Sequence, residues 1–127
     1  MAEPRARASS DARTIALLGN PNVGKTSLFN QLTGLRQKVG NYPGVTVERR
    51  EGRLSAGGGD LSLIDLPGVN SLAARAPDEQ VAVDVLTGAQ AGVTRPDGVV
   101  VVIDASRPRR GLFLTSQVME LGLPTIV

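Results

Sequence analysis

One octapeptide limits what this chain can fold into more than any other segment. Residues 19–26 are Gly-Asn-Pro-Asn-Val-Gly-Lys-Thr, which matches the pattern G-x-x-x-x-G-K-[ST]. The apolar run Thr14–Leu18 precedes it, and Lys25–Thr33, with apolar residues at helical spacing, overlaps its end. Because the pattern requires a strand before it and a helix after it, we expect a phosphate-binding loop that joins a buried strand to a helix.

The spacing within this loop has a mechanical reason. Glycines let the backbone curl so that successive N–H groups point at phosphate oxygens, and the N-terminus of the next helix adds partial positive charge. Lys25 supplies a cation for the outer phosphates, and the Thr26 hydroxyl is a ligand for Mg²⁺. The candidate nucleotide-contacting residues here are Gly19, Asn20, Pro21, Asn22, Val23, Gly24, Lys25, Thr26 and Ser27. The alternative is a chance glycine-rich turn, which the flanking elements disfavour.

A second motif, Asp65-Leu66-Pro67-Gly68, follows the apolar segment Leu61–Ile64. If that segment is a strand beside the first one, its carboxyl end brings Asp65 close to Thr26. We expect Asp65 to hold the hydration shell of Mg²⁺ and Gly68 to turn its N–H toward a γ-phosphate, with Leu66 and Pro67 also in the nucleotide-contacting set. Taken alone, an aspartate at this position more often closes a turn after a strand, and it is the phosphate loop that favours the Mg²⁺ role.

The segment between these motifs carries a threonine at its end. Residues 35–46 contain two glycines, a proline and an asparagine without periodicity, which predicts a long mobile loop. The Thr46 hydroxyl would reach the same Mg²⁺ only when a γ-phosphate draws this loop closed, and Gly44 and Val45 join the nucleotide-contacting set. Alternatively, Thr46 simply begins a strand. The three motifs together describe a switch GTPase with Lys25, Thr46 and Gly68 as candidate catalytic residues.

The remaining segments alternate strands with helices. We expect strands at Val47–Ser55, Leu61–Ile64, Gly98–Asp104 and from Thr125, and helices from Asp78 to Thr87 and over Gly111–Leu121. The charged segment Val47–Ser55 suits an edge strand, and we expect Leu112, Val118 and Leu121 to face inward. Residues 1–13 are expected to be a disordered basic tail. This order predicts an α/β fold with a mostly parallel sheet and ligand chemistry at the carboxyl ends of its strands.

Composition excludes several classes of site and partner. The 127 residues contain no cysteine and no histidine, so disulfides, Cys- or His-ligated metal centres and His general bases are absent. A net charge of +2 with only three aromatic residues does not suit a nucleic-acid partner. Apolar runs such as Val99–Ile103 are far shorter than the roughly 20 residues that cross a bilayer. We therefore expect no membrane contact by this chain itself.

The sequences of these motifs resemble those of one protein family. Gly19–Gly34, Val39–Glu48, Asp65–Gly68, Ser71-Leu72 and Asp78–Gln80 closely resemble the cytoplasmic G domain of the bacterial ferrous iron transporter family FeoB. Related ribosome-assembly and tRNA-modifying GTPases carry a different sequence in place of Val39–Glu48. The resemblance implies a Ras-like P-loop GTPase fold of three layers with one antiparallel edge strand. It also implies that residues 14–127 are a partial G domain, which reaches only the start of the fifth strand and lacks the C-terminal part.

The same resemblance implies ligands and partners. They are GTP or GDP with Mg²⁺, K⁺ held by Asn22, and a polytopic membrane region that takes up Fe²⁺, with the domain on the cytoplasmic face of the bacterial inner membrane. The alternative role of Asn22 is to brace the loop through backbone hydrogen bonds. An Asn/Thr-Lys-x-Asp guanine motif is absent from the 127 residues.

The residue after the second motif departs from the Ras pattern. Val69 stands where Ras-like enzymes have a glutamine that orients water, so we expect slow hydrolysis suited to a regulatory timer. Two alternatives to the iron-transport assignment remain: a ribosome- or tRNA-associated GTPase, and a nucleotide-binding module that does not hydrolyse.

Overall fold

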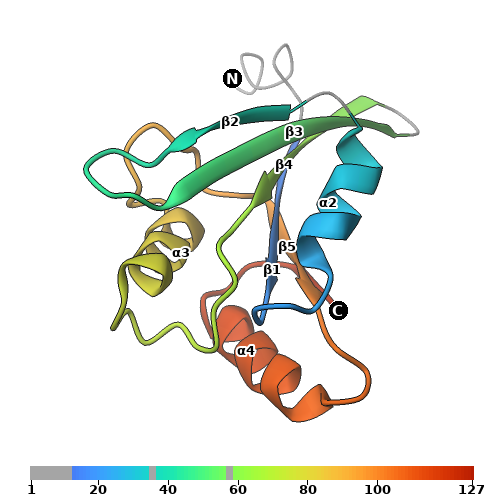
Figure 1. Cartoon of the computed structure of the whole chain (residues 1–127), viewed down its shortest axis with the longest axis vertical. Coiled ribbons are helices and arrows are strands. Elements are labelled where there is room, and N and C mark those ends of the chain that lie inside the picture. Colours follow the sequence, from blue (N-terminus) through green and yellow to red (C-terminus); the bar gives the residue numbers. More distant parts are fainter. Residues whose placement is uncertain (1–12, 35–36, 57–58) are drawn as a thin grey trace.

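A six-stranded mixed sheet organises the chain in this computed structural model, which describes residues 13–34, 37–56 and 59–127 (Figure 1). The strands are β1 (Arg13–Gly19), β2 (Gln37–Asn41), β3 (Glu48–Ala56), β4 (Gly59–Asp65), β5 (Gly98–Val102) and β6 (Thr125–Ile126). Their order across the sheet is β2-β3-β4-β1-β5-β6. The central strand β1 runs parallel to both neighbours, β4 and β5, and β5 runs parallel to β6. The expected parallel core is therefore confirmed.

Within the described ranges, three helices cover the two faces of this sheet: α2 (Lys25–Thr33), α3 (Pro77–Thr87) and α4 (Pro108–Glu120). Alternation along β1 sends Leu17 to one face, where it packs with Phe29 of α2, while Ala16 and Leu18 face the opposite core. That second core contains Val85 of α3 and residues of α4. The result is the expected three-layer α/β arrangement, with α2 on one face and α3 and α4 on the other (Figure 1).

The segment predicted as a loop between residues 35 and 46 contains a strand. Residues 37–41 form β2, which pairs antiparallel with β3, and β3 pairs antiparallel with β4. The edge strand is therefore β2, and the prediction that Val47–Ser55 forms the edge was wrong. The sequence Gln-Lys-Val-Gly-Asn has no alternation of apolar and polar residues, because β2 buries neither face fully. The tail assigned to residues 1–13 lies outside the described residues except for Arg13.

Helix α4 starts three residues before its predicted beginning. Of the residues expected to face inward, Val118 is buried and Leu121 packs against the core, which confirms them, but Leu112 does not face inward. The buried residues of α4 are Gly111, Leu114, Thr115 and Val118, whereas Leu112, expected inside, is 56% exposed. The cause is a close approach at Gly111, where a Cβ atom would lie 2.4 Å from Cγ1 of Ile103. Only a glycine lets the helix backbone come this near the side chain of Ile103, the residue after β5. Among the described residues, no helix has the length and apolar character needed to cross a membrane.

Candidate functional site

The phosphate-loop motif forms the turn between β1 and α2. Asn22 and Gly24 both have positive φ, 65° and 89°, so the backbone curls tightly between Gly19 and the first helical residue, Lys25. When residues with positive and negative φ alternate along a loop, successive N–H groups point into one concavity, and such a concavity binds anions. Gly24 also begins the helical hydrogen bonding, because Leu28 N–H donates to its carbonyl at 3.0 Å. A substitution at Gly24 would be strained by its φ alone.

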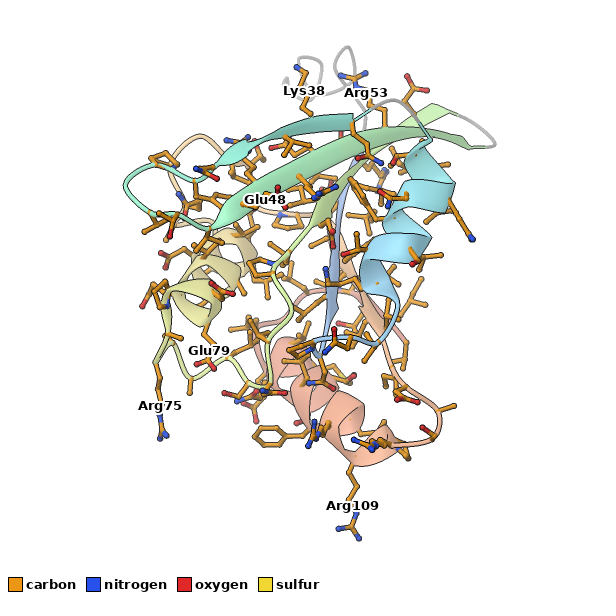
Figure 2. All side chains as sticks on the ribbon, viewed as in Figure 1. Lys38, Glu48, Arg53, Arg75, Glu79 and Arg109 are labelled. Carbon is orange, nitrogen blue, oxygen red and sulfur yellow. The ribbon has the colours of Figure 1, made fainter. Side chains whose placement is uncertain are left out.

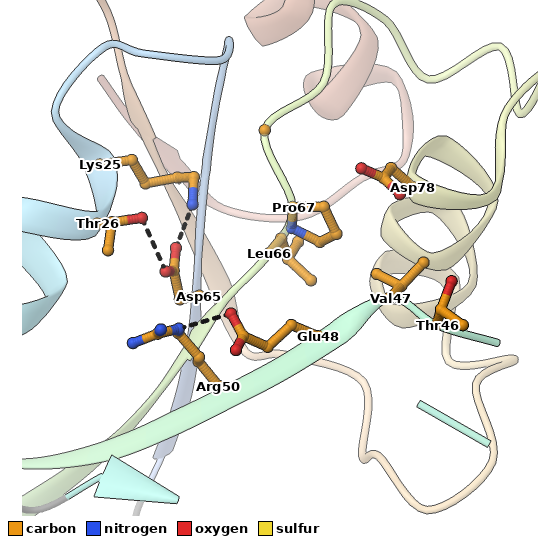
Figure 3. A pocket seen from close by; sticks show the side chains of 11 residues that line it. Lys25, Thr26, Thr46, Val47, Glu48, Arg50, Asp65, Leu66, Pro67 and Asp78 are labelled. Atoms are coloured by element: carbon orange, nitrogen blue, oxygen red, sulfur yellow. Dashed lines mark hydrogen bonds and ion pairs between the residues drawn. The ribbon is translucent and has the colours of Figure 1, made fainter. Parts of the chain in front are cut away.

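Three side chains from two separate motifs meet beside this loop (Figure 3). Lys25 Nζ pairs with Asp65 Oδ1, and both side chains are almost fully buried, 7% and 4% exposed. Thr26 Oγ1 lies 3.4 Å from Asp65 Oδ2 on the same carboxylate. Lys25 and Thr26 are in the first turn of α2, and Asp65 is the last residue of β4. The sheet order explains the meeting, because β4 and β1 are parallel neighbours with their carboxyl ends at the same edge.

The second motif is fixed against the phosphate loop by its backbone. Leu66 N–H donates to the Leu17 carbonyl at 3.1 Å, and Val69 N–H donates to the Gly19 carbonyl at 3.0 Å. The Asn20 side chain, 5% exposed, returns a hydrogen bond from Nδ2 to the Val69 carbonyl at 3.0 Å. Asn20 therefore joins the two motifs and does not point its amide at the loop interior.

Gly68 lies directly against the phosphate loop. A Cβ on Gly68 would be 3.0 Å from Cα of Pro21, so the two backbones touch there and a side chain would force them apart. Beyond Val69 the chain is tied differently, since Leu72 N–H donates to Gln117 Oε1 of α4 at 2.9 Å. The segment between Val69 and α3 is thus hydrogen-bonded to α4, which comes later in the sequence.

Tyr42, the only tyrosine of the chain, is buried and hydrogen-bonded within the loop before β3. Tyr42 is 1% exposed, its N–H donates to the Val47 carbonyl at 3.0 Å, and its carbonyl accepts from Val45 N–H at 3.3 Å. Burial raises the pKa of the Tyr42 hydroxyl to about 12, and that buried hydroxyl has no hydrogen-bond partner among the described residues. Gly44 turns the loop with φ 79°. Thr46 is thereby left exposed at the far side of the site (Figure 3).

These elements enclose a cavity of about 260 Å³. Its lining includes the expected Lys25, Thr26, Thr46 and Asp65, and also Leu66, Pro67 and Gly68. The structure does not bring the Thr46 hydroxyl into hydrogen-bonding contact with Thr26 or Asp65; it lies on the opposite wall. Ser27 is exposed on α2 and Val45 is 37% exposed on the loop, and neither lines this cavity.

Three polar residues of the cavity wall were not anticipated as site residues: Glu48, Arg50 and Asp78. Glu48 and Arg50 are two apart on β3, so they share a face, and Arg50 Nε donates to Glu48 Oε1 at 2.9 Å. Arg50 is also directly opposite Asp65 in the β3–β4 register. Asp78 reaches the cavity from the first turn of α3. The sequence feature that could have predicted Glu48 and Arg50 as site residues is their spacing of two residues, which places both on one face of the strand next to the Asp65 strand.

The donor set suits a hard divalent cation. Thr26 and Asp65 offer one hydroxyl and one carboxylate on neighbouring elements, which are the oxygen ligands that Mg²⁺ uses together with water and phosphate oxygens. Within residues 13–34, 37–56 and 59–127 no group of three or more carboxylate, imidazole or thiol side chains forms a separate metal cluster. The residues present therefore fit a Mg²⁺ ion bound jointly with a polyphosphate.

A second, smaller cavity of about 170 Å³ lies on the outer side of the phosphate loop. Residues 20–23 line it together with Asp104, Arg107 and Arg110. Hydrogen bonds from the Ser106 side chain and backbone, followed by the charge of Arg107, lower the pKa of Asp104. Asn22, the candidate K⁺ ligand, borders this second cavity and is absent from the lining of the first one.

Comparison with known proteins decides the family. The family model described as "Ferrous iron transport protein B" matches residues 13–127. The chain belongs to this family. The Fe(2+) transporter FeoB of Shigella flexneri is 50% identical over 118 residues, which cover 90% of this chain and 15% of that relative. The Salmonella typhimurium FeoB is 49% identical over the same number of residues. This chain thus spans about 15% of the length of the curated FeoB relatives.

Solved FeoB structures share the fold. The G domain of the T. maritima FeoB iron transporter superposes with a TM-score of 0.81 at 42% identity, covering 90% of this chain and 69% of that one. A GDP-bound variant of the S. thermophilus FeoB G domain gives 0.80 at 48% identity, with coverages of 89% and 41%. The chain therefore has the Ras-like P-loop GTPase fold of FeoB G domains, as the sequence predicted.

Proposed function

We propose that this chain binds guanine nucleotide with Mg²⁺, hydrolyses GTP slowly, and regulates Fe²⁺ uptake as the cytoplasmic domain of a bacterial membrane transporter. The observation that carries the proposal is the meeting of Lys25, Thr26 and Asp65 at one cavity beside a loop with positive φ at Asn22 and Gly24. Relatives support the ligand, because homologous FeoB structures are described in GDP and GMPPNP forms.

Each residue of this site has a separate role in binding a triphosphate. Lys25 exchanges its Asp65 partner for phosphate oxygens, which frees the Asp65 carboxylate to orient a hydrated cation together with the Thr26 hydroxyl. A bound Mg²⁺ supplies neutralisation of the charge that develops on the phosphoryl oxygens. Gly68, already in backbone contact with the phosphate loop, offers its N–H to the outermost phosphate. Thr46 completes the site when its loop moves across the cavity, which couples loop position to the γ-phosphate.

Slow hydrolysis follows from Val69. Its side chain is 3% exposed and apolar, and both its N–H and its carbonyl are already bonded to the phosphate loop. No group at this position orients an attacking water. We include Asn22 as the candidate K⁺ ligand that compensates for this deficiency, since its side chain is exposed beside the loop.

Nucleotide binding by the full chain tests the assignment, with the two lysines as a matched pair. Fluorescent GDP and GTP should bind in the presence of Mg²⁺. Lys25→Ala should weaken their affinity about 10- to 100-fold, because the free energy of a hydrogen bond to a charged group corresponds to a change of that size. Lys38→Ala, at an exposed position of β2, should leave affinity unchanged. Thr26→Ala should remove the Mg²⁺-dependent part of the affinity alone. Equal binding by Lys25→Ala, verified as folded by circular dichroism, would contradict the proposal, and equal competition by ADP would contradict the guanine assignment.

Single-turnover phosphate release separates a slow GTPase from a module that does not hydrolyse. Release should be faster in K⁺ than in Na⁺, and Asn22→Ala should abolish that difference without changing GDP affinity. Release that is undetectable in either salt, with GTP bound, would identify a non-hydrolysing module.

A further inference from the structure

The outward face of α4 is unusually apolar for an exposed helix. Leu112, Phe113 and Met119 are 56%, 55% and 62% exposed, and these three large side chains lie on one side of the helix. The helical period explains this, because Gly111, Leu114, Thr115 and Val118 occupy the side that packs on the sheet. Leu112, Phe113 and Met119 therefore all lie on the outward side of the helix, which we call the stripe, with Arg109, Ser116 and Glu120 between Phe113 and the other two. The described part of the chain does not cover these three side chains.

Arginines adjoin this stripe at the amino end of the helix. Arg107, Arg109 and Arg110 are all exposed, and Arg109 extends away from the body of the protein (Figure 2). No charged residue occurs between Arg110 and Glu120, so the positive charge of this surface is concentrated at the amino end of the helix. An exposed face that combines arginines with leucine, phenylalanine and methionine is typical of helices that lie on an anionic bilayer.

We propose that the outer face of α4, formed by Arg109, Arg110, Leu112, Phe113 and Met119, docks onto an anionic lipid membrane surface. The arginines bind phosphate and carboxylate groups of lipid headgroups, and the apolar side chains enter the boundary between headgroups and acyl chains. The charge of the face favours this occupant, since anionic lipid complements Arg109 and Arg110. The curated relatives are transporters, which places a bilayer within reach of such a domain.

The proposal goes beyond the nucleotide function and rests on it only for the proximity of a membrane. It also departs from the expectation, drawn from the sequence, that the chain makes no membrane contact. That expectation was based on the lack of a bilayer-spanning segment, whereas adsorption at the surface requires only an exposed basic and apolar face. Glu120 marks the carboxyl end of the stripe, so the arginine end should contact the headgroups most closely.

Vesicle cosedimentation of the full chain without nucleotide tests the docking. The chain should bind vesicles that contain phosphatidylglycerol and should not bind pure phosphatidylcholine vesicles. Each arginine near an anionic surface contributes about five-fold in partitioning, or ~1 kcal/mol, so Arg109→Glu with Arg110→Glu should reduce binding at least about 25-fold. The matched control is Lys38→Glu with Arg53→Glu, which changes net charge equally at the opposite end of the molecule (Figure 2).

A fluorescence reporter tests whether the apolar stripe enters the lipid. The chain has no tryptophan, so Phe113→Trp introduces a single probe on the stripe and Val39→Trp, at a position 57% exposed on β2, provides the control. The Phe113→Trp emission should shift to the blue with anionic vesicles, and Val39→Trp emission should not. Equal loss of binding in both charge variants, or no vesicle binding at all, would overturn the proposal. A shift without vesicles that depends on protein concentration would overturn it in favour of a second copy of the chain.

Discussion

The single tyrosine of this chain should ionise about two pH units above the usual value. Tyr42 is 1% exposed, and burial raises the pKa of its hydroxyl from 10.0 to about 12. Glu51 and Asp65 add to the increase, while the guanidinium of Arg49, 5.9 Å from the ring centroid, opposes it. Because no residue in the described ranges forms a hydrogen bond with the buried hydroxyl, ionisation in place would leave a phenolate in an apolar core.

The pKa difference has a definite consequence for the free energy of unfolding. The folded protein holds the tyrosine proton more tightly than the unfolded chain, so this stabilisation is complete below pH 10 and is lost as the pH rises from 10 to 12. Two pH units correspond to about 3 kcal/mol. At neutral pH, Tyr42→Phe removes a buried hydroxyl that lacks a partner, and we expect it to stabilise the fold by about 1–3 kcal/mol.

The composition makes the measurement direct. With one tyrosine and no tryptophan, the absorbance of phenolate near 295 nm reports Tyr42 alone. The folded chain should titrate near pH 12 and the urea-unfolded chain near pH 10, with circular dichroism to verify folding at each pH. The Tyr42→Phe variant is the control for all other titrations, and its stability should fall less between pH 10 and 12. A folded chain that titrates at pH 10 would refute the burial of this hydroxyl.

Two further predictions concern stability measured by urea unfolding. Lys25→Ala should cost about 3–5 kcal/mol, because it leaves the buried Asp65 carboxylate without its partner, and Lys25→Met combined with Asp65→Asn should recover most of the loss. A Lys25→Ala variant as stable as the parent would contradict the buried pair. Gly111→Ala should cost about 1–3 kcal/mol through the clash with Ile103, whereas Ser116→Ala, on the exposed side of the same helix, should not destabilise. Stabilisation by Gly111→Ala would show that Ile103 moves aside freely.

Local patterns predicted the centre of the sheet and the motif positions. The strand expected at Thr14–Leu18 is β1, Arg13–Gly19, and the helix expected at Lys25–Thr33 begins and ends at those residues. Both follow from short-range features: an apolar run, a glycine-rich turn and helical periodicity. The proximity of Asp65 to Thr26 followed from one topological rule, that neighbouring parallel strands end at the same edge.

The errors arose where tertiary contacts decide the structure. Strand β2 is formed by pairing with β3, and its own residues give no alternating signal. The orientation of α4 depends on the approach of Gly111 to Ile103, which spacing along the helix does not reveal. The position of Thr46 across the cavity depends on the buried side chain of Tyr42, which fixes the loop before β3.

The hydrogen bond between Leu72 and Gln117 links the segment after the Asp65–Gly68 motif to helix α4. Val69 is hydrogen-bonded to the phosphate loop through both its N–H and its carbonyl, whereas Leu72 is hydrogen-bonded to α4. A displacement of Leu72 relative to α4 would break this hydrogen bond unless Gln117 moved with it. A helix held on a bilayer would resist such a displacement, and the change would then be taken up by the segment between Val69 and Leu72 beside the phosphate loop.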